Sequence, residues 1–162
     1  MTPLELITAR KAHLDRLANR RGAEGERDVH FLMADWTPRP TGERCRTLLS
    51  VLAEAGKPIK ASAFDALVLP PQVNLDDASS ISRQLSEIIF IEIKTANQAR
   101  VKPGFEGYFF ALTENEIMAS DLLGEQHRVA LFNNLTGEIL LTSVPDIVAR
   151  AKSSTWQLSL QL

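Results

Sequence analysis

The segment Glu87-Ile-Ile-Phe-Ile-Glu-Ile-Lys94 is the strongest strand signal in the chain and decides the fold. Its isoleucines are β-branched, and β-branched residues favour strands. Side chains alternate across a strand, so Ile91 and Ile93 are expected on one face, and Glu92 and Lys94 on the other. Before the charged pair the segment is apolar on both faces. We therefore expect a central strand that is buried on both sides.

Helix and strand patterns surround this segment. Residues 42–55 have helical character, with Thr41 as the expected N-cap and Gly56 as the stop. Thr113-Glu-Asn-Glu116 is a capping-box sequence, which predicts a helix that runs to about Leu123. Residues 70–86 are polar and loop-like, with a possible helical turn at 80–85. The other expected helices cover 2–20, 24–35 and 145–152, and the other expected strands cover 64–69, 108–112, 128–132, 138–142 and 156–160.

The order of these elements predicts an α/β fold. Helices come first, and strands mixed with helices follow without a regular βαβ alternation. This order fits a small mixed sheet in an α/β or α+β domain. The chain has 162 residues, which is long enough to bury a core and short for two domains, so we expect a single domain, 1–162.

Composition and charge exclude several classes of protein. The chain is 44% hydrophobic and 23% charged, which is ordinary for a globular protein and excludes a disordered or collagen-like one. No apolar run approaches the roughly 20 residues that span a bilayer, and the first residues carry no export signal. Cys45 is the single cysteine, so neither an internal disulfide nor a Cys-rich zinc site is expected. We expect a cytoplasmic protein without membrane contact.

Asp65, Glu92 and Lys94 are the candidate chemical groups. Taken alone, Glu92 and Lys94 fit a strand end that emerges into water. Asp65 also lies in an apolar strand segment, and two carboxylates would meet beside an ammonium group if the two strands are neighbours. Mg²⁺ binds such oxygens together with water and phosphate, and it lowers the pKa of a bound water. Lys94 would position that water or stabilise developing negative charge.

This arrangement resembles the PD-(D/E)XK nuclease superfamily, which has the restriction-endonuclease-like fold. Asp65 and Glu92-Ile-Lys94 match its motif, with Phe64 in place of the motif's proline. Within the superfamily, the chain resembles the domain at the C-terminus of plant No-Vein proteins, which also occurs in many bacterial proteins. The segments that carry this second likeness are Phe90–Thr95, Phe109–Glu116 and Arg128–Phe132.

The resemblance implies a fold, a cofactor and a substrate. The fold is an αβββαβ core with a mixed sheet. It covers residues 22–142, with additional N-terminal helices in 1–20 and a C-terminal helix and strand in 143–162. The cofactor is Mg²⁺ or Mn²⁺, held by Asp65, Glu92 and the carbonyl oxygen of Ile93. The expected activity is endonucleolytic hydrolysis of DNA, and enzymes of this fold often act as homodimers.

A glutamate before the core is a further expected metal contact. Gly22-Ala-Glu-Gly-Glu26-Arg-Asp-Val29 is similar to the opening helix of Holliday-junction resolvases and methyl-directed restriction enzymes. In those families a glutamate at this place often joins the metal site. Glu26 is the better match here, and Glu24 is the second. The helix dipole alone also favours an acid in the first turn.

Gln98, Arg100 and Lys102 are weaker candidates for contacts with nucleic acid. Arginine and lysine dominate phosphate contacts, but ordinary surface placement explains these residues equally well. Glu116 is assigned to helix capping. The three histidines are far apart in sequence, so a histidine metal site is not expected.

The alternative function is a binding or protein-interaction module that keeps the fold without turnover. The net charge of −2 suits this alternative, because the molecule as a whole does not attract nucleic acid. The apolar stripe of the expected helix at 2–20 would then dock a partner or form a homodimer. Glycine-rich phosphate loops and a serine-hydrolase motif do not occur in the sequence.

Overall fold

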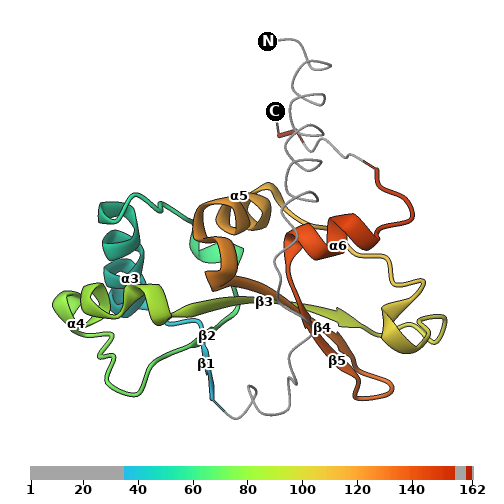
Figure 1. The fold of residues 1–162 in the computed structure, drawn as a ribbon, viewed down its shortest axis with the longest axis horizontal. Coiled ribbons are helices and arrows are strands. Elements are labelled where there is room, and N and C mark those ends of the chain that lie inside the picture. The colour runs from blue at the N-terminus through green and yellow to red at the C-terminus, as the bar shows by residue number, and fades with distance from the viewer. Residues whose placement is uncertain (1–34, 156–159, 162) are drawn as a thin grey trace. The chain divides into compact units, whose positions relative to one another are not determined.

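The computed structural model describes residues 35–155 and 160–161. The chain divides into two compact units, one of residues 24–143 and one of residues 1–23 with 144–162. The predicted core boundary at 142 lies beside this division. In the larger unit the described elements are β1 (Trp36–Pro38), α3 (Gly42–Glu54), β2 (Ala66–Val68), α4 (Ala78–Arg83), β3 (Ile89–Ala96), α5 (Glu114–Leu123), β4 (His127–Asn133) and β5 (Ile139–Thr142) (Figure 1).

The larger unit is built on one five-stranded mixed sheet in the order β1-β2-β3-β4-β5. β1, β2 and β3 pair antiparallel, and β4 pairs antiparallel with β5. β3 and β4 are parallel, and α5 lies in the connection between them. A parallel pair needs such a crossover. The predicted α/β fold with a small mixed sheet is confirmed.

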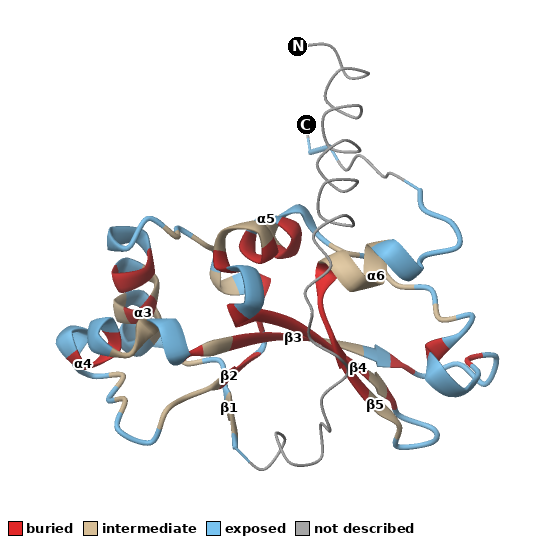
Figure 2. Cartoon of the chain, in the orientation of Figure 1, coloured by how far each residue is buried: buried red, intermediate tan, exposed pale blue. Residues whose placement is uncertain are grey.

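β3 is the central strand, and it is buried on both faces as predicted. On one face Phe90 packs edge-on against Phe64, with ring centroids 5.2 Å apart, among apolar side chains of α3 and α5. On the other face Ile91 packs against Ala130 and Leu141. Figure 2 shows buried residues along β3 and β4. The alternation predicted for this strand is therefore correct, and it directs Glu92 and Lys94 toward the helix-covered face.

Both predicted helix starts are observed, but their caps differ. The Thr113 side chain accepts a hydrogen bond from the Glu116 N–H, and the Glu116 carboxylate accepts one from the Thr113 N–H, so the capping box is complete. Thr41 is the N-cap of α3, but its side chain makes no capping hydrogen bond. α3 is held by the apolar face that buries Leu48 and Leu52.

Two strand predictions need correction. Residues 108–112 form no strand, because their aromatic side chains pack within a loop: the rings of Tyr108 and Phe110 lie 4.9 Å apart. Conversely, no strand was expected before residue 64, yet Trp36–Pro38 forms β1. β1 lies at the edge of the sheet, where a proline without an N–H is tolerated.

The described part of the smaller unit contains α6 (Val144–Arg150), which confirms the helix expected at 145–152. The helix expected at 2–20 lies outside the described residues, as does most of the strand expected at 156–160. Of the helix expected at 24–35, only Asp35 is described, and it lies in a turn. Among the described residues, none of the helices has both the length and the apolar character that crossing a membrane requires.

Candidate active site

Asp65 lies just before β2, at the point where β2 and β3 part. Its N–H donates to the Ile91 carbonyl oxygen at 2.7 Å, although the next residue, Ala66, is the one in register with Ile91. Two consecutive residues thus face one residue of β3, as in a β-bulge, and bulges re-aim side chains. The Asp65 Oδ2 atom accepts a hydrogen bond from the Ile93 N–H at 2.9 Å. This exposed carboxylate therefore lies on the edge of β3, beside the residue that follows Glu92.

Glu92 and Lys94 form an ion pair on the helix-covered face of β3. The Lys94 Nζ atom lies 3.0 Å from Glu92 Oε1, and the two side chains are only 15% and 8% exposed. The second partner of Lys94 is Glu116 of α5, whose Oε1 atom lies 2.8 Å away and whose side chain is 4% exposed. We call Glu92, Lys94 and Glu116 the carboxylate–lysine cluster.

Glu116 has a role that the sequence interpretation missed. Its Oε2 atom accepts from the Thr113 N–H and completes the capping box, while its Oε1 atom binds Lys94. One carboxylate therefore ties the start of α5 to the functional face of β3. The signal was present in the sequence: a lysine on the buried face of a central strand requires a partner, and the residue assigned only to capping supplies it.

Burial and the neighbouring charges shift the pKa values within the cluster. The pKa of Glu92 is raised to about 8, chiefly by burial; the hydrogen bond from Lys94 lowers this pKa, and the nearby Glu116 carboxylate adds to the rise. Burial would lower the pKa of Lys94, but its hydrogen bonds to Glu116 and Glu92 outweigh this effect and leave that pKa raised. Lys94 is therefore an ammonium ion at neutral pH, and Glu92 takes up a proton below about pH 8.

His127 lies at the start of β4, beside the cluster. It is fully buried, and its Nε2 atom lies 3.0 Å from the Ala63 carbonyl oxygen. Burial lowers the pKa of His127, and the charges of Glu116 and Lys94 have smaller, opposing effects. The ring is neutral, so Nε2 carries the proton that it donates to Ala63. Nδ1 is buried without a hydrogen-bond partner. The sequence analysis considered His127 only as a metal ligand and missed this position.

The remaining predicted residues do not enter the cluster. Gln98, Arg100 and Lys102 are exposed in the loop after β3, where the Arg100 Nε atom donates to Gln98 Oε1 at 3.1 Å. Ile93 is half-buried. The N–H and C=O groups of one strand residue point to the same edge, so its carbonyl oxygen faces the side on which Asp65 binds its N–H. Glu24 and Glu26 lie outside the described residues.

The oxygen atoms of Asp65, Glu92 and the Ile93 carbonyl are of the type that a hard divalent cation binds. Among residues 35–155 and 160–161, no three His, Cys, Asp or Glu side chains gather as a metal-binding group. Asp65, Glu92 and the Ile93 carbonyl would supply two carboxylates and one main-chain oxygen. Mg²⁺ commonly binds one or two carboxylates and keeps several waters. These donors match such a cation in type, and water and a substrate phosphate would complete its coordination.

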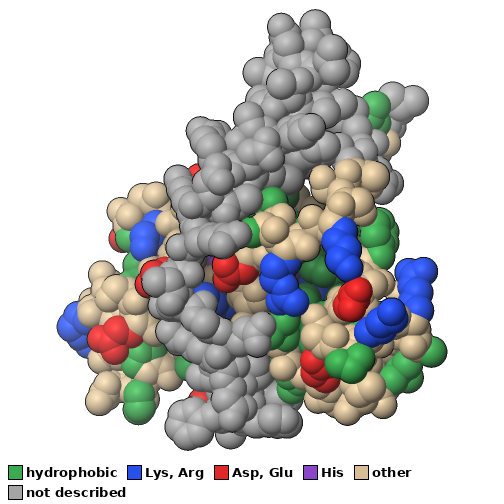
Figure 3. All heavy atoms as spheres, turned by 45° about the vertical axis from the view of Figure 1, so that its right-hand side comes forward, with side chains coloured by type: hydrophobic (Ala, Val, Ile, Leu, Met, Phe, Trp, Pro, Cys, Tyr) green, Lys and Arg blue, Asp and Glu red, His purple; other side chains and the backbone are tan. Residues whose placement is uncertain are grey.

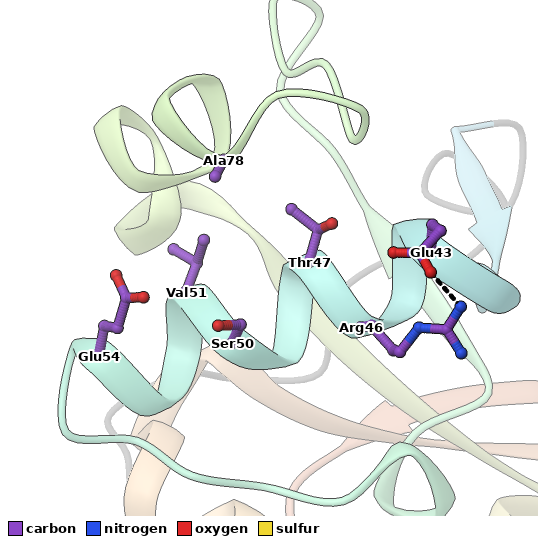
Figure 4. Close-up of a pocket in the computed structure, with 7 residues that line it drawn as sticks. All are labelled: Glu43, Arg46, Thr47, Ser50, Val51, Glu54 and Ala78. Atoms are coloured by element: carbon purple, nitrogen blue, oxygen red, sulfur yellow. Dashed lines mark hydrogen bonds and ion pairs between the residues drawn. The ribbon is translucent and has the colours of Figure 1, made fainter.

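The hollow between α3 and α4 lies apart from these groups. It has a volume of about 280 Å³ and is lined by Glu43, Arg46, Thr47, Ser50, Val51, Glu54 and Ala78 (Figure 4). Glu43 and Arg46 form an ion pair within it. None of the predicted site residues lines it, so the candidate chemistry is not in this hollow.

Comparisons of the chain with protein-family models, with curated proteins and with solved structures found no match.

Proposed function

We propose that the chain is a metal-dependent phosphodiester hydrolase that cuts DNA internally and has a restriction-endonuclease-like core. The strand order supports this fold, because the antiparallel strands β2 and β3 are followed by α5 and then by β4, which is parallel to β3, and this series matches the ββαβ part of the αβββαβ order. α3 and α4 separate β1, β2 and β3 along the chain, which the αβββαβ order does not include. The observation that carries the proposal is the position of Lys94. Its ammonium group is charged and lies 3.0 Å from the Glu92 carboxylate, and Ile93, the residue between these two in the chain, donates its N–H to Asp65.

Each group would have one task. Asp65, Glu92 and the Ile93 carbonyl oxygen would hold Mg²⁺ or Mn²⁺. When bound, such a cation lowers the pKa of a coordinated water and neutralises charge on the phosphate. Lys94 would orient the attacking water or donate to the oxygen on which negative charge develops. Glu116 would act as a positioning residue, since it holds the ammonium group from α5.

A catalytically inactive binding module is the second candidate, and one observation favours it. Glu92 Oε1 is already paired with Lys94, and this pair satisfies both charges without a cation. The side chains coloured in Figure 3 agree with a molecule of low charge: lysine and arginine are interspersed with acidic residues, and the net charge is −2.

Cleavage assays with matched variants test the proposal. Supercoiled plasmid, linear duplex, branched DNA and single strands would be incubated with Mg²⁺ or Mn²⁺, with EDTA as the metal-free control. We expect metal-dependent cleavage by the wild type and its loss in Lys94→Ala and Asp65→Asn. Arg83→Ala, which removes an exposed cation from α4, is the control for charge alone. Wild-type cleavage by Lys94→Ala would reject this mechanism.

Calorimetry separates the two candidates independently of substrate choice. If the chain is a hydrolase, the wild type should bind Mg²⁺ or Mn²⁺, and Asp65→Asn should bind the same cation more weakly. An intact fold that binds neither cation and cuts none of these DNAs would support the module instead.

A further inference from the structure

The loop of residues 97–112 joins two elements of the candidate site. It starts directly after β3, which carries Glu92 and Lys94, and it ends at Thr113, the N-cap that binds Glu116. Tyr108 in this loop lies within electrostatic reach of Lys94: burial raises the pKa of its hydroxyl, and the Lys94 charge acts in the opposite direction. The loop therefore connects the two elements, β3 and α5, that carry the carboxylate–lysine cluster.

The loop has a defined shape. Gly104 and Phe105 have φ of 72° and 62°, and positive φ is costly for a residue with a side chain. Two hydrogen bonds hold this turn: the Lys102 N–H donates to the Glu106 carbonyl at 3.0 Å, and the Gly104 N–H donates to Glu138 Oε1 at 2.8 Å. The strained Phe105 is only 7% exposed and anchors the loop.

The aromatic side chains of the loop divide into an inner and an outer group. Phe105, Tyr108 and Phe110 contact one another in sequence, with centroid distances of 6.1 Å and 4.9 Å. Phe109 lies between two of them in the chain but is 69% exposed. The Phe109 ring is exposed to water, while the rings on either side of it in the chain pack against each other and hold the loop. Another planar ring can therefore stack on Phe109. Arg100 and Lys102, both exposed, precede it in the same loop.

We propose that this loop binds an unpaired nucleic-acid strand, with a base stacked on Phe109 and phosphates contacted by Arg100 and Lys102. The inference rests on the proposed function and names its substrate class. An exposed ring stacks on bases of any identity, and cationic side chains follow the backbone, which together give binding without sequence preference. In a duplex the base faces are already stacked, so an unpaired base gains more from the ring. The preferred DNA would therefore present a single strand, an end or a flap beside Lys94.

Binding without divalent cations tests the loop apart from turnover. Fluorescence anisotropy in EDTA would compare a labelled single strand with the duplex of the same sequence. We expect the wild type to prefer the single strand and Phe109→Ala to bind it about 5- to 150-fold more weakly, the range that removal of one base–aromatic stack gives. Phe109→Trp should retain the affinity. Met118→Ala, which removes a 51% exposed apolar side chain from α5, is the matched control.

A second measurement detects the stack itself. A 2-aminopurine base in the strand should lose fluorescence on binding to the wild type, and this quenching should vanish in Phe109→Ala. Equal single-strand binding by the wild type and Phe109→Ala, or a preference for duplex, would overturn the inference, and docking of a protein on Phe109 would then be the better explanation.

The two proposals fail in different ways. If the wild type cuts DNA but Phe109→Ala binds the single strand as tightly as the wild type does, the loop inference is rejected and the hydrolase proposal stands. Single-strand binding that depends on Phe109, without cleavage of any DNA, supports the stacking contact and rejects the hydrolase.

Discussion

The β3–α5 side and the α3–α4 side of the larger unit hold ion pairs of nearly equal length in opposite surroundings. Lys94 Nζ and Glu116 Oε1 lie 2.8 Å apart, and their side chains are 15% and 4% exposed. Arg44 and Asp76 lie 2.7 Å apart, and their side chains are 58% and 59% exposed. Distance alone does not distinguish these pairs. Burial distinguishes them. Removing an ion from water costs free energy, whereas water around an exposed pair screens the attraction between its two charges.

The electrostatic consequences differ accordingly. In the exposed pair, the mutual hydrogen bonds raise the pKa of Arg44 and lower that of Asp76, so both groups become easier to charge. In the buried cluster, the pKa of Glu92 rises to about 8, so its charged form is disfavoured. When burial disfavours the charged form of a group, its ion pair adds little to the free energy of unfolding. Such groups concentrate at functional sites, which is why the cluster and not the exposed pair is the candidate for chemistry.

The largest expected loss of stability comes from removing the ammonium group of Lys94. Lys94→Met leaves two buried carboxylates without their shared partner, and breaking a buried pair costs about 3–5 kcal/mol. Urea denaturation above the pKa of Glu92 would measure the free energy of unfolding, with the exposed Lys60→Met as the control. If Lys94→Met reduces the free energy of unfolding no more than Lys60→Met does, the ammonium group of Lys94 does not stabilise the two carboxylates.

The next effect is a dependence of stability on pH. The pKa of Glu92 is about 8 in the folded state and near its ordinary value of 4.5 when unfolded, so the folded state binds the extra proton between these values. Stability must therefore fall as pH rises toward 8, by at most ~1.4 kcal/mol per pH unit, and then level off. His127 has a lowered pKa, so its own contribution to stability is lost only below about pH 6.5.

Denaturation at several pH values between about 7 and 9 isolates Glu92, because His127 is then neutral in both states. Glu92→Gln mimics the protonated group and should flatten the curve. A wild-type stability that rises over this interval would contradict the assignment.

The two N-cap threonines give a smaller contrast. Thr113→Ala removes a side-chain cap and loosens the hold of Glu116 on α5, so it should reduce the free energy of unfolding by about 1 kcal/mol. Thr41→Ala removes no capping hydrogen bond and should cost less. Thermal denaturation of the two variants in parallel measures the difference, and an equal loss in both would show that the capping box adds nothing.

The smallest effect is expected at the exposed pair. Asp76→Asn and Arg44→Ala should leave the midpoint of denaturation almost unchanged, and added salt should shift neither variant differently from the wild type. A clear loss of stability in either variant would remove the contrast between the two regions.

The sequence predicted what depends on local pattern. The strand around Ile91 and the capping box at Thr113 were correct because alternation and capping involve residues close together in the chain. The β-strand expected at Tyr108–Leu112 was wrong because aromatic residues favour strands but here pack on one another in a loop.

The site was predictable only in part, because its groups meet through tertiary packing. Glu92 and Lys94 share a face by strand geometry, which a sequence shows. Their contacts with Glu116 and the position of His127 depend on the crossover through α5 and on the parallel register of β4. The hydrogen bond from the Ile93 N–H to Asp65 depends on a bulge-like irregularity that no pattern in the sequence marks.

That hydrogen bond also affects how the molecule behaves toward other chains. β2 pairs with residues 89–91 of β3, so among the described residues the part of β3 after Ile91 has no neighbouring strand on that side. Free strand edges recruit other extended polypeptides and lead to aggregation. By occupying the Ile93 donor with a charged group, Asp65 blocks the first position that an incoming strand would use. The same carboxylate therefore protects this stretch of β3 from pairing with another chain, although β3 is not an outer strand of the sheet.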